Sequence, residues 1–131
     1  MKKRKHLIVG ISTFLVVAII LLFFIPTPNI IFPGQATAGQ IYEDNNITCR
    51  LSDDDTQKCI EIFAGKWCYI DSPACGFDEN VYLQIGISKF LPACDGCAIV
   101  KSGNKYFTLT KGERKTLDGI LKKYGIKFPC V

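Results

Sequence analysis

The feature that most constrains this chain is an uninterrupted apolar run near its N-terminus, from Leu7 to Ile25. No charged side chain occurs within it. Because an α-helix rises about 1.5 Å per residue, a helix over this run would be roughly 28 Å long, close to the hydrocarbon core of a bilayer at about 30 Å. A helix also satisfies its own backbone hydrogen bonds, as lipid requires. The run therefore predicts a single transmembrane helix that places residues 7–25 in a lipid bilayer.

The charges that precede the run predict its orientation. Residues 2–5 are all basic, and a cationic flank of this kind stays on the cytoplasmic side. We therefore expect a single-pass cell-membrane protein with a cytoplasmic N-terminus and an extracytoplasmic C-terminal domain. The alternative is a secreted protein, because Ala36-Thr37-Ala38 has the small-x-small form at which signal peptides are cleaved, after Ala38. The length of the run and its distance from Ala38 favour a retained anchor.

Composition divides the chain into three regions. Residues 1–25 form the basic flank and anchor, and residues 26–40, which are rich in Pro and Gly, are expected to form a stalk without regular structure. Residues 41–131 then form one small domain. Four of the sixteen bases belong to the flank, which leaves twelve bases against twelve acids in the rest of the chain. A nucleic-acid partner is excluded, because such binding requires a basic surface.

Residue patterns predict an α+β domain with an antiparallel sheet and two flanking helices. Ser52 is the predicted N-cap of a first helix. Its first turn contains three aspartates, and the helix ends at Gly65. Thr110 and Glu113 form the capping pair of a second helix, whose apolar face faces the sheet and which Gly125 ends. Aromatic and β-branched residues predict strands at 66–70 and 81–87, and a hairpin within 97–110.

The seven cysteines all follow the apolar run. They are Cys49, Cys59, Cys68, Cys75, Cys94, Cys97 and Cys130. In a short extracytoplasmic domain this density predicts a disulfide framework, whereas the same count in a reducing compartment would indicate metal binding. Each bridge would stabilise the domain by about 2–4 kcal/mol. Because seven is odd, one cysteine remains: it either links two copies into a covalent homodimer or is Cys59, an inert thiol on the apolar face of the first helix.

Cys94-Asp95-Gly96-Cys97 is the motif with the most specific chemistry. Two cysteines at this spacing support thiol–disulfide exchange, with Cys94 as the attacking thiol and Cys97 as the resolving thiol. The same pair, with Cys68 and Cys75, could instead complete a four-sulfur metal site, although this spacing is not diagnostic. We expect neither a metal nor another cofactor, because the only histidine, His6, precedes the apolar run.

Other catalytic and modification signals are sparse. Without a histidine after the apolar run there is no Ser-His or Cys-His nucleophile pair, and no glycine-rich phosphate loop occurs. Hydrolase activity is therefore not expected. Asn46-Ile47-Thr48 makes Asn46 a candidate for glycosylation wherever the compartment supplies the enzyme.

The sequence thus favours a membrane-anchored extracytoplasmic interaction or accessory domain, stabilised by disulfides, without catalysis of its own and with a protein partner that it does not identify. Two alternatives stay open: a membrane-tethered thiol–disulfide oxidoreductase that uses Cys94 and Cys97, and a cysteine-ligated metal site. For the interaction domain, four aromatic residues are candidates for an exposed binding patch: Trp67, Tyr69, Tyr82 and Phe90.

Overall fold

The computed structural model describes residues 2–128, and within the first helix it describes the side chains of residues 8–23. This part of the chain is α+β. Its helices are α1 (Lys2–Phe24), α2 (Asp53–Phe63) and α3 (Lys111–Lys123). Its strands are β1 (Thr27–Pro28), β2 (Ala36–Tyr42), β3 (Asn45–Arg50), β4 (Trp67–Cys68), β5 (Val81–Ile85), β6 (Ser88–Pro92), β7 (Ile99–Ser102) and β8 (Lys105–Thr108).

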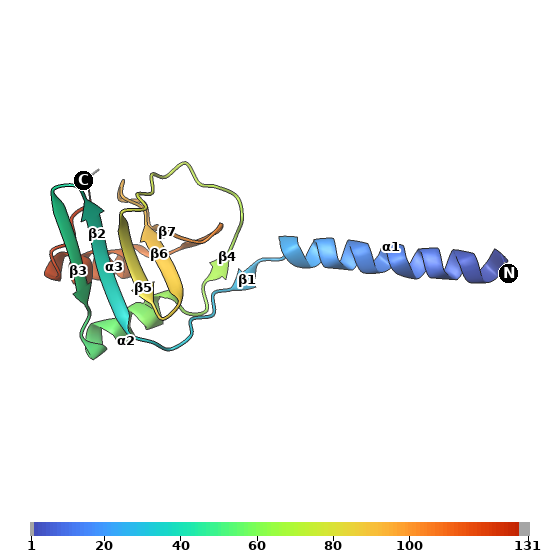
Figure 1. The fold of residues 1–131 in the computed structure, drawn as a ribbon, viewed down its shortest axis with the longest axis horizontal. Coiled ribbons are helices and arrows are strands. Elements are labelled where there is room, and N and C mark those ends of the chain that lie inside the picture. Colours follow the sequence, from blue (N-terminus) through green and yellow to red (C-terminus); the bar gives the residue numbers. More distant parts are fainter. Residues whose placement is uncertain (1, 129–131) are drawn as a thin grey trace.

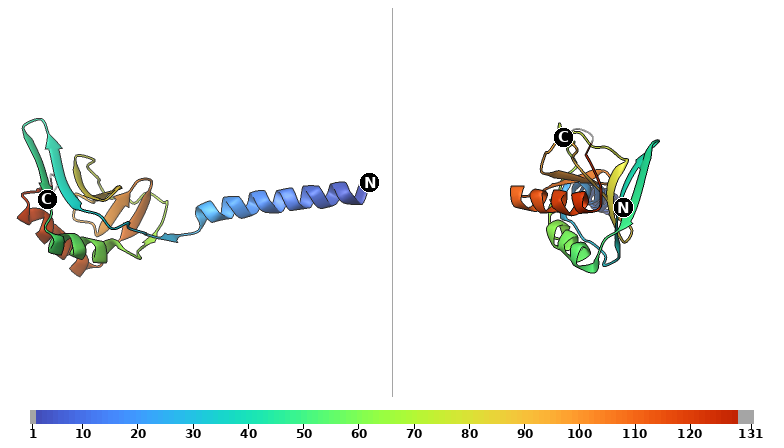
Figure 2. Two further views of the ribbon diagram at one scale, coloured as in Figure 1. Left: turned by 60° about the horizontal axis from the view of Figure 1, so that its bottom comes forward. Right: turned by 90° about the vertical axis from the view of Figure 1, so that its left-hand side faces the viewer.

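The larger sheet is antiparallel throughout, in the order β3-β2-β5-β6-β7-β8, and β1 pairs with β4 in a separate two-stranded sheet. Helices α2 and α3 lie side by side against one face of the larger sheet (Figure 2). Helix α1 extends away from this domain and joins it through β1 (Figure 1).

An aromatic cluster forms the centre of the core between the helices and the sheet. The ring of Phe63 on α2 lies 4.7 Å from that of Phe90 on β6 and 5.5 Å from that of Phe107 on β8, measured between centroids. All three side chains are fully buried. Leu117 and Leu121 of α3 are buried in the same cluster, so the predicted apolar face of the second helix does face the sheet.

Both predicted helices of the domain are confirmed, together with their caps. The Ser52 hydroxyl accepts a hydrogen bond from the Asp55 amide, and Thr110 and Glu113 form a reciprocal capping box. The strand predicted at 81–87 forms as β5, which ends at Ile85, and the hairpin predicted within 97–110 is β7 and β8. The segment 66–70 contributes only the short strand β4, followed by a single bridge from Tyr69 to Tyr106.

The predicted transmembrane helix, and with it the single-pass cell-membrane location, is wrong. Among the residues that the structure describes, no helix is both long enough and apolar enough to cross a membrane. Helix α1 does form over the apolar run.

The region predicted as a stalk, residues 26–40, also differs from the structure. Strand β2 begins at Ala36, inside that region, and pairs with β3 on one side and β5 on the other. Ala38 is fully buried and is paired with Cys49 and Leu83. Cleavage after Ala38 would therefore divide an interior strand of the sheet, which argues against the secreted alternative.

The predicted disulfide framework is wrong for the cysteines that the structure describes. No two of the sulfurs of Cys49, Cys59, Cys68, Cys75, Cys94 and Cys97 are at bonding distance, and Cys130 lies outside the described residues. Three of these cysteines are dispersed over separate elements, Cys49 on β3, Cys59 on α2 and Cys68 on β4. Cys59 is fully buried, in agreement with the inert-thiol alternative.

Candidate functional site

The candidate site lies where two segments far apart in the sequence are held together. One is the turn between β6 and β7, which carries the Cys94-x-x-Cys97 motif, and the other is the long loop between β4 and β5. The Cys94 amide donates a hydrogen bond to the Gly76 carbonyl (2.9 Å), and the Gly76 amide donates to the Asp95 carboxylate (2.9 Å). These two bonds fix residue 75 of the loop over the turn.

The carboxylate of Asp95 organises the turn itself. Its second oxygen accepts a hydrogen bond from the Cys97 amide (3.2 Å), an arrangement typical of aspartate in turns. Hydrogen bonds from the amides of Gly76 and then Cys97 lower the pKa of Asp95, so the side chain is an ionised carboxylate at neutral pH. Gly96 has a φ of 83°, a conformation that glycine adopts without steric cost.

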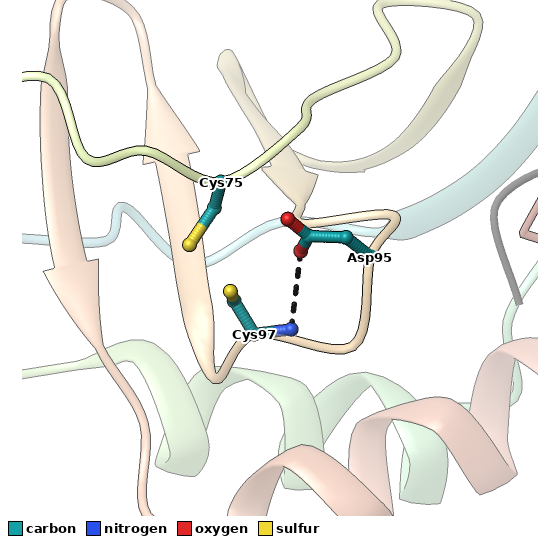
Figure 3. Close-up of side chains that lie close together, drawn as sticks. All are labelled: Cys75, Asp95 and Cys97. Atoms are coloured by element: carbon teal, nitrogen blue, oxygen red, sulfur yellow. Dashed lines mark hydrogen bonds between the residues drawn. The ribbon is translucent and has the colours of Figure 1, made fainter.

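Three potential ligand atoms converge at this point. A sulfur of Cys75, a carboxylate oxygen of Asp95 and the sulfur of Cys97 all lie within 4.8 Å of one another (Figure 3). The two sulfurs point toward each other, one from the loop and one from the turn (Figure 3). Both cysteines are half-buried and Asp95 is exposed, so solvent and ions have access to the cluster.

The two cysteines of the predicted exchange pair, Cys94 and Cys97, differ in their surroundings. Cys94 is buried, at 4% exposure, and its sulfur lies 3.4 Å from the Gly76 carbonyl oxygen. An attacking thiol needs access to its substrate and a lowered pKa. Hydrogen bonding with the side chains of Cys75 and then Asp95 raises the pKa of Cys97 to about 12.

The predicted four-sulfur set is not assembled either. Cys68 is buried on β4, and its thiol donates a hydrogen bond to the Lys66 carbonyl (3.8 Å). Within the described residues, the group brought together contains Cys75 and Cys97 but neither Cys68 nor Cys94. Asp95, which lies inside the Cys94-x-x-Cys97 motif, supplies the third potential ligand. Its position between two cysteines in the sequence is the feature that could have identified it as a candidate ligand.

The four aromatic candidates do not form one patch. Trp67 is 65% exposed, Tyr69 and Tyr82 are half-buried, and Phe90 is fully buried in the core. The glycosylation candidate Asn46 lies exposed on β3.

A cavity of about 660 Å³ lies beside the turn and is separate from the cysteine cluster. It is lined by Gly96, Arg114, Asp118, Lys122 and residues 125–128. Of these residues only Gly96 belongs to the turn, and no ligand side chain of the cluster lines the cavity. The cluster of Cys75, Asp95 and Cys97 is therefore the site with the more specific chemistry.

No protein-family model, no curated protein and no solved structure matches this chain.

Proposed function

We propose that this protein binds a thiophilic divalent cation, best matched by Zn²⁺, through Cys75, Asp95 and Cys97. The observation that carries the proposal is the convergence of two sulfurs and one carboxylate oxygen within 4.8 Å of one another. In a tetrahedral zinc site, with Zn–S near 2.3 Å and Zn–O near 2.1 Å, ligand atoms are separated by about 3.5–3.8 Å. To reach these separations from at most 4.8 Å, the ligand atoms of the cluster would have to approach one another by roughly 1 Å.

The chemistry of the donor set supports this choice of cation. Thiolates select soft or borderline cations such as Zn²⁺, whereas Ca²⁺ and Mg²⁺ prefer sites made of oxygen ligands. The Asp95 carboxylate is already oriented by the amides of Gly76 and Cys97. Hydrogen bonds of this kind, which fix a ligating side chain before the metal arrives, are a regular feature of metal sites.

The exposure of the cluster bears on the type of site. Structural zinc sites are closed by four protein ligands, while sites with three protein ligands leave a coordination position for water or a substrate. The described cluster supplies three ligands, two half-buried and one exposed. We therefore expect the fourth coordination position of the bound cation to be open to water or to another ligand from solution.

Two observations favour cation binding over the other functions that the sequence left open. Thiol–disulfide exchange is disfavoured by the burial of Cys94, its expected attacking residue. An interaction domain is disfavoured by the burial of Phe90, which cannot take part in an exposed aromatic patch.

The test is a titration of the full chain, reduced and stripped of metal, with Co²⁺ and then with Zn²⁺ as competitor. Each thiolate ligand of Co²⁺ contributes a near-ultraviolet charge-transfer absorption, so the spectrum reports the sulfur ligands directly. We expect one equivalent to bind, and Cys75→Ser and Cys97→Ser each to weaken binding at least tenfold. Asp95→Asn should weaken binding while both thiolate contributions remain.

Cys49→Ser is the matched control, because Cys49 is also half-buried but its sulfur lies on β3, near the Tyr124 carbonyl. Its titration should superimpose on that of the wild type. The proposal is wrong if the wild type takes up no stoichiometric Co²⁺, or if Cys75→Ser and Cys97→Ser bind as tightly as Cys49→Ser.

A further inference from the structure

Arg114 on α3 reaches the turn of the cluster from the side of the helices. Only 5% of this residue is exposed. Its Nη2 donates a hydrogen bond to the Ala93 carbonyl (2.7 Å), and its Nη1 donates to the Cys97 carbonyl (2.6 Å). Its Nε donates to the Asp118 carboxylate (2.8 Å). One guanidinium therefore binds both ends of the segment 93–97.

This arrangement depends on the geometry of arginine. The guanidinium is planar and presents its N–H groups in a rigid fork, so two carbonyls bound to it are held at a fixed separation. An ammonium group in the same place would keep the charge but lose the fork. The segment whose ends are held carries two of the three ligands, Asp95 and Cys97.

The surroundings of Arg114 keep the guanidinium in one place. Asp118, one turn further along α3, pairs with Nε, and the ring of Phe128 lies 5.1 Å from the guanidinium carbon. A buried charge is tolerated only when it is paired and hydrogen-bonded. Because its partners are the turn carbonyls as well as Asp118, displacement of the turn would remove hydrogen bonds from a buried cation.

We infer that Arg114 is a positioning residue for the cation site: by fixing the carbonyls of residues 93 and 97, it sets the separation of the Asp95 and Cys97 ligands. This inference rests on the proposed function, since it assigns Arg114 a part in the same site. Arg114 does not itself contact the cation.

The test compares Arg114→Lys with the wild type in the Co²⁺ titration. We expect the affinity for Co²⁺ to fall about tenfold or more, in the range known for changes to residues that orient metal ligands. The ligand-field absorption, which depends on the angles between ligands, should also change, while the sulfur charge-transfer bands persist. Asp55→Asn, which destabilises the domain at a distance from the site, is the control for stability loss alone.

The outcomes distinguish failure of the proposed cation binding from failure of the role inferred for Arg114. Absence of Co²⁺ binding by the wild type overturns the proposed function and this inference together. Normal wild-type binding overturns only the inference if Arg114→Lys has no greater effect on affinity and spectrum than Asp55→Asn. Should Arg114→Lys fail to fold, Asp118→Asn replaces it, because it removes the carboxylate that orients the guanidinium. An unchanged Co²⁺ affinity and spectrum in that variant also overturns the inference.

Discussion

A buried carboxylate, that of Asp55, connects the start of α2 to the end of α3. One of its oxygens, Oδ2, accepts hydrogen bonds from Lys123 Nζ (2.7 Å), from the Tyr124 hydroxyl (2.7 Å) and from the Ser52 hydroxyl (3.0 Å). Only 5% of Asp55 is exposed. We predict that this single oxygen contributes a substantial part of the stability of the domain.

Asp55→Asn keeps the shape of the side chain but removes its charge, which allows the contribution to be measured. A hydrogen bond to a charged group is worth about 1.5–3 kcal/mol, but such values are not additive. The side chain of Lys123 is 62% exposed, so its pair with Asp55 contributes less than about 1 kcal/mol. We expect a total loss of about 2–3 kcal/mol, which for a domain of this size lowers Tm by roughly 10–20 °C.

The pH dependence provides an independent measure of the same interaction. The hydrogen bonds from Lys123 and Tyr124 lower the pKa of Asp55 to about 2. Since the folded pKa lies below the unfolded value of about 3.9, the stabilisation is complete above pH ~4 and is lost as the pH falls toward 2. The shift corresponds to a loss on the order of 2 kcal/mol over that interval, and Asp55→Asn should abolish this part of the pH dependence.

Urea unfolding followed by far-ultraviolet circular dichroism measures both effects. Asp54→Asn is the matched control, because Asp54 lies in the same first turn of α2 but its side chain is 85% exposed and pairs with the exposed Lys58. That change should alter the free energy of unfolding by no more than about 0.5 kcal/mol. The reasoning is refuted if the two variants unfold at the same urea concentration at pH 7, or if Asp55→Asn destabilises between pH 4 and pH 2 as steeply as the wild type.

Two further predictions concern the packing of the sheet and the reactivity of the thiols. A Cβ at position 39 would overlap the ring of Tyr82, so Gly39→Ala should lower the free energy of unfolding by about 1–3 kcal/mol. Thermal unfolding of the variant with and without Tyr82→Ser checks this, and an equal cost in both backgrounds contradicts it. Burial raises the pKa of Cys59 to about 12, so iodoacetamide should label Cys75 in the native protein but Cys59 only after denaturation. Mass spectrometry that finds both labelled at one rate would contradict the second prediction.

The helices of the domain were predictable because the signals that begin them are local. Ser52 lies three residues from Asp55, and Thr110 lies three residues from Glu113, so each cap forms within one turn whatever the rest of the chain does. Strand β2 was missed for the opposite reason. The glycine and small residues of 36–39 indicate a linker when read alone. In the structure they fit because Ala36 and Ala38 are fully buried and the ring of Tyr82 covers Gly39.

The candidate site could be predicted only in part, because its ligands are brought together by the sheet and not by the motif. The spacing of Cys94 and Cys97 drew attention to the correct turn. Yet the residue whose sulfur faces Cys97 is Cys75 (Figure 3), which precedes it by the whole of β5 and β6. Successive side chains around a tight turn need not share a face, and here Cys94 points into the protein, at 4% exposure.

Seven cysteines in a short domain indicate disulfides in an oxidising compartment and metal ligands in a reducing one. An extracytoplasmic location followed from the apolar run, and the disulfide framework followed from that location. The described part of the chain contains no disulfide, so the number of cysteines does not by itself decide between a framework and metal ligands. The choice then depends on geometry, and the geometry is specific: two of the half-buried cysteines share one site with an oriented carboxylate. The proposed cation would be held there by side chains that the fold places within 4.8 Å of one another.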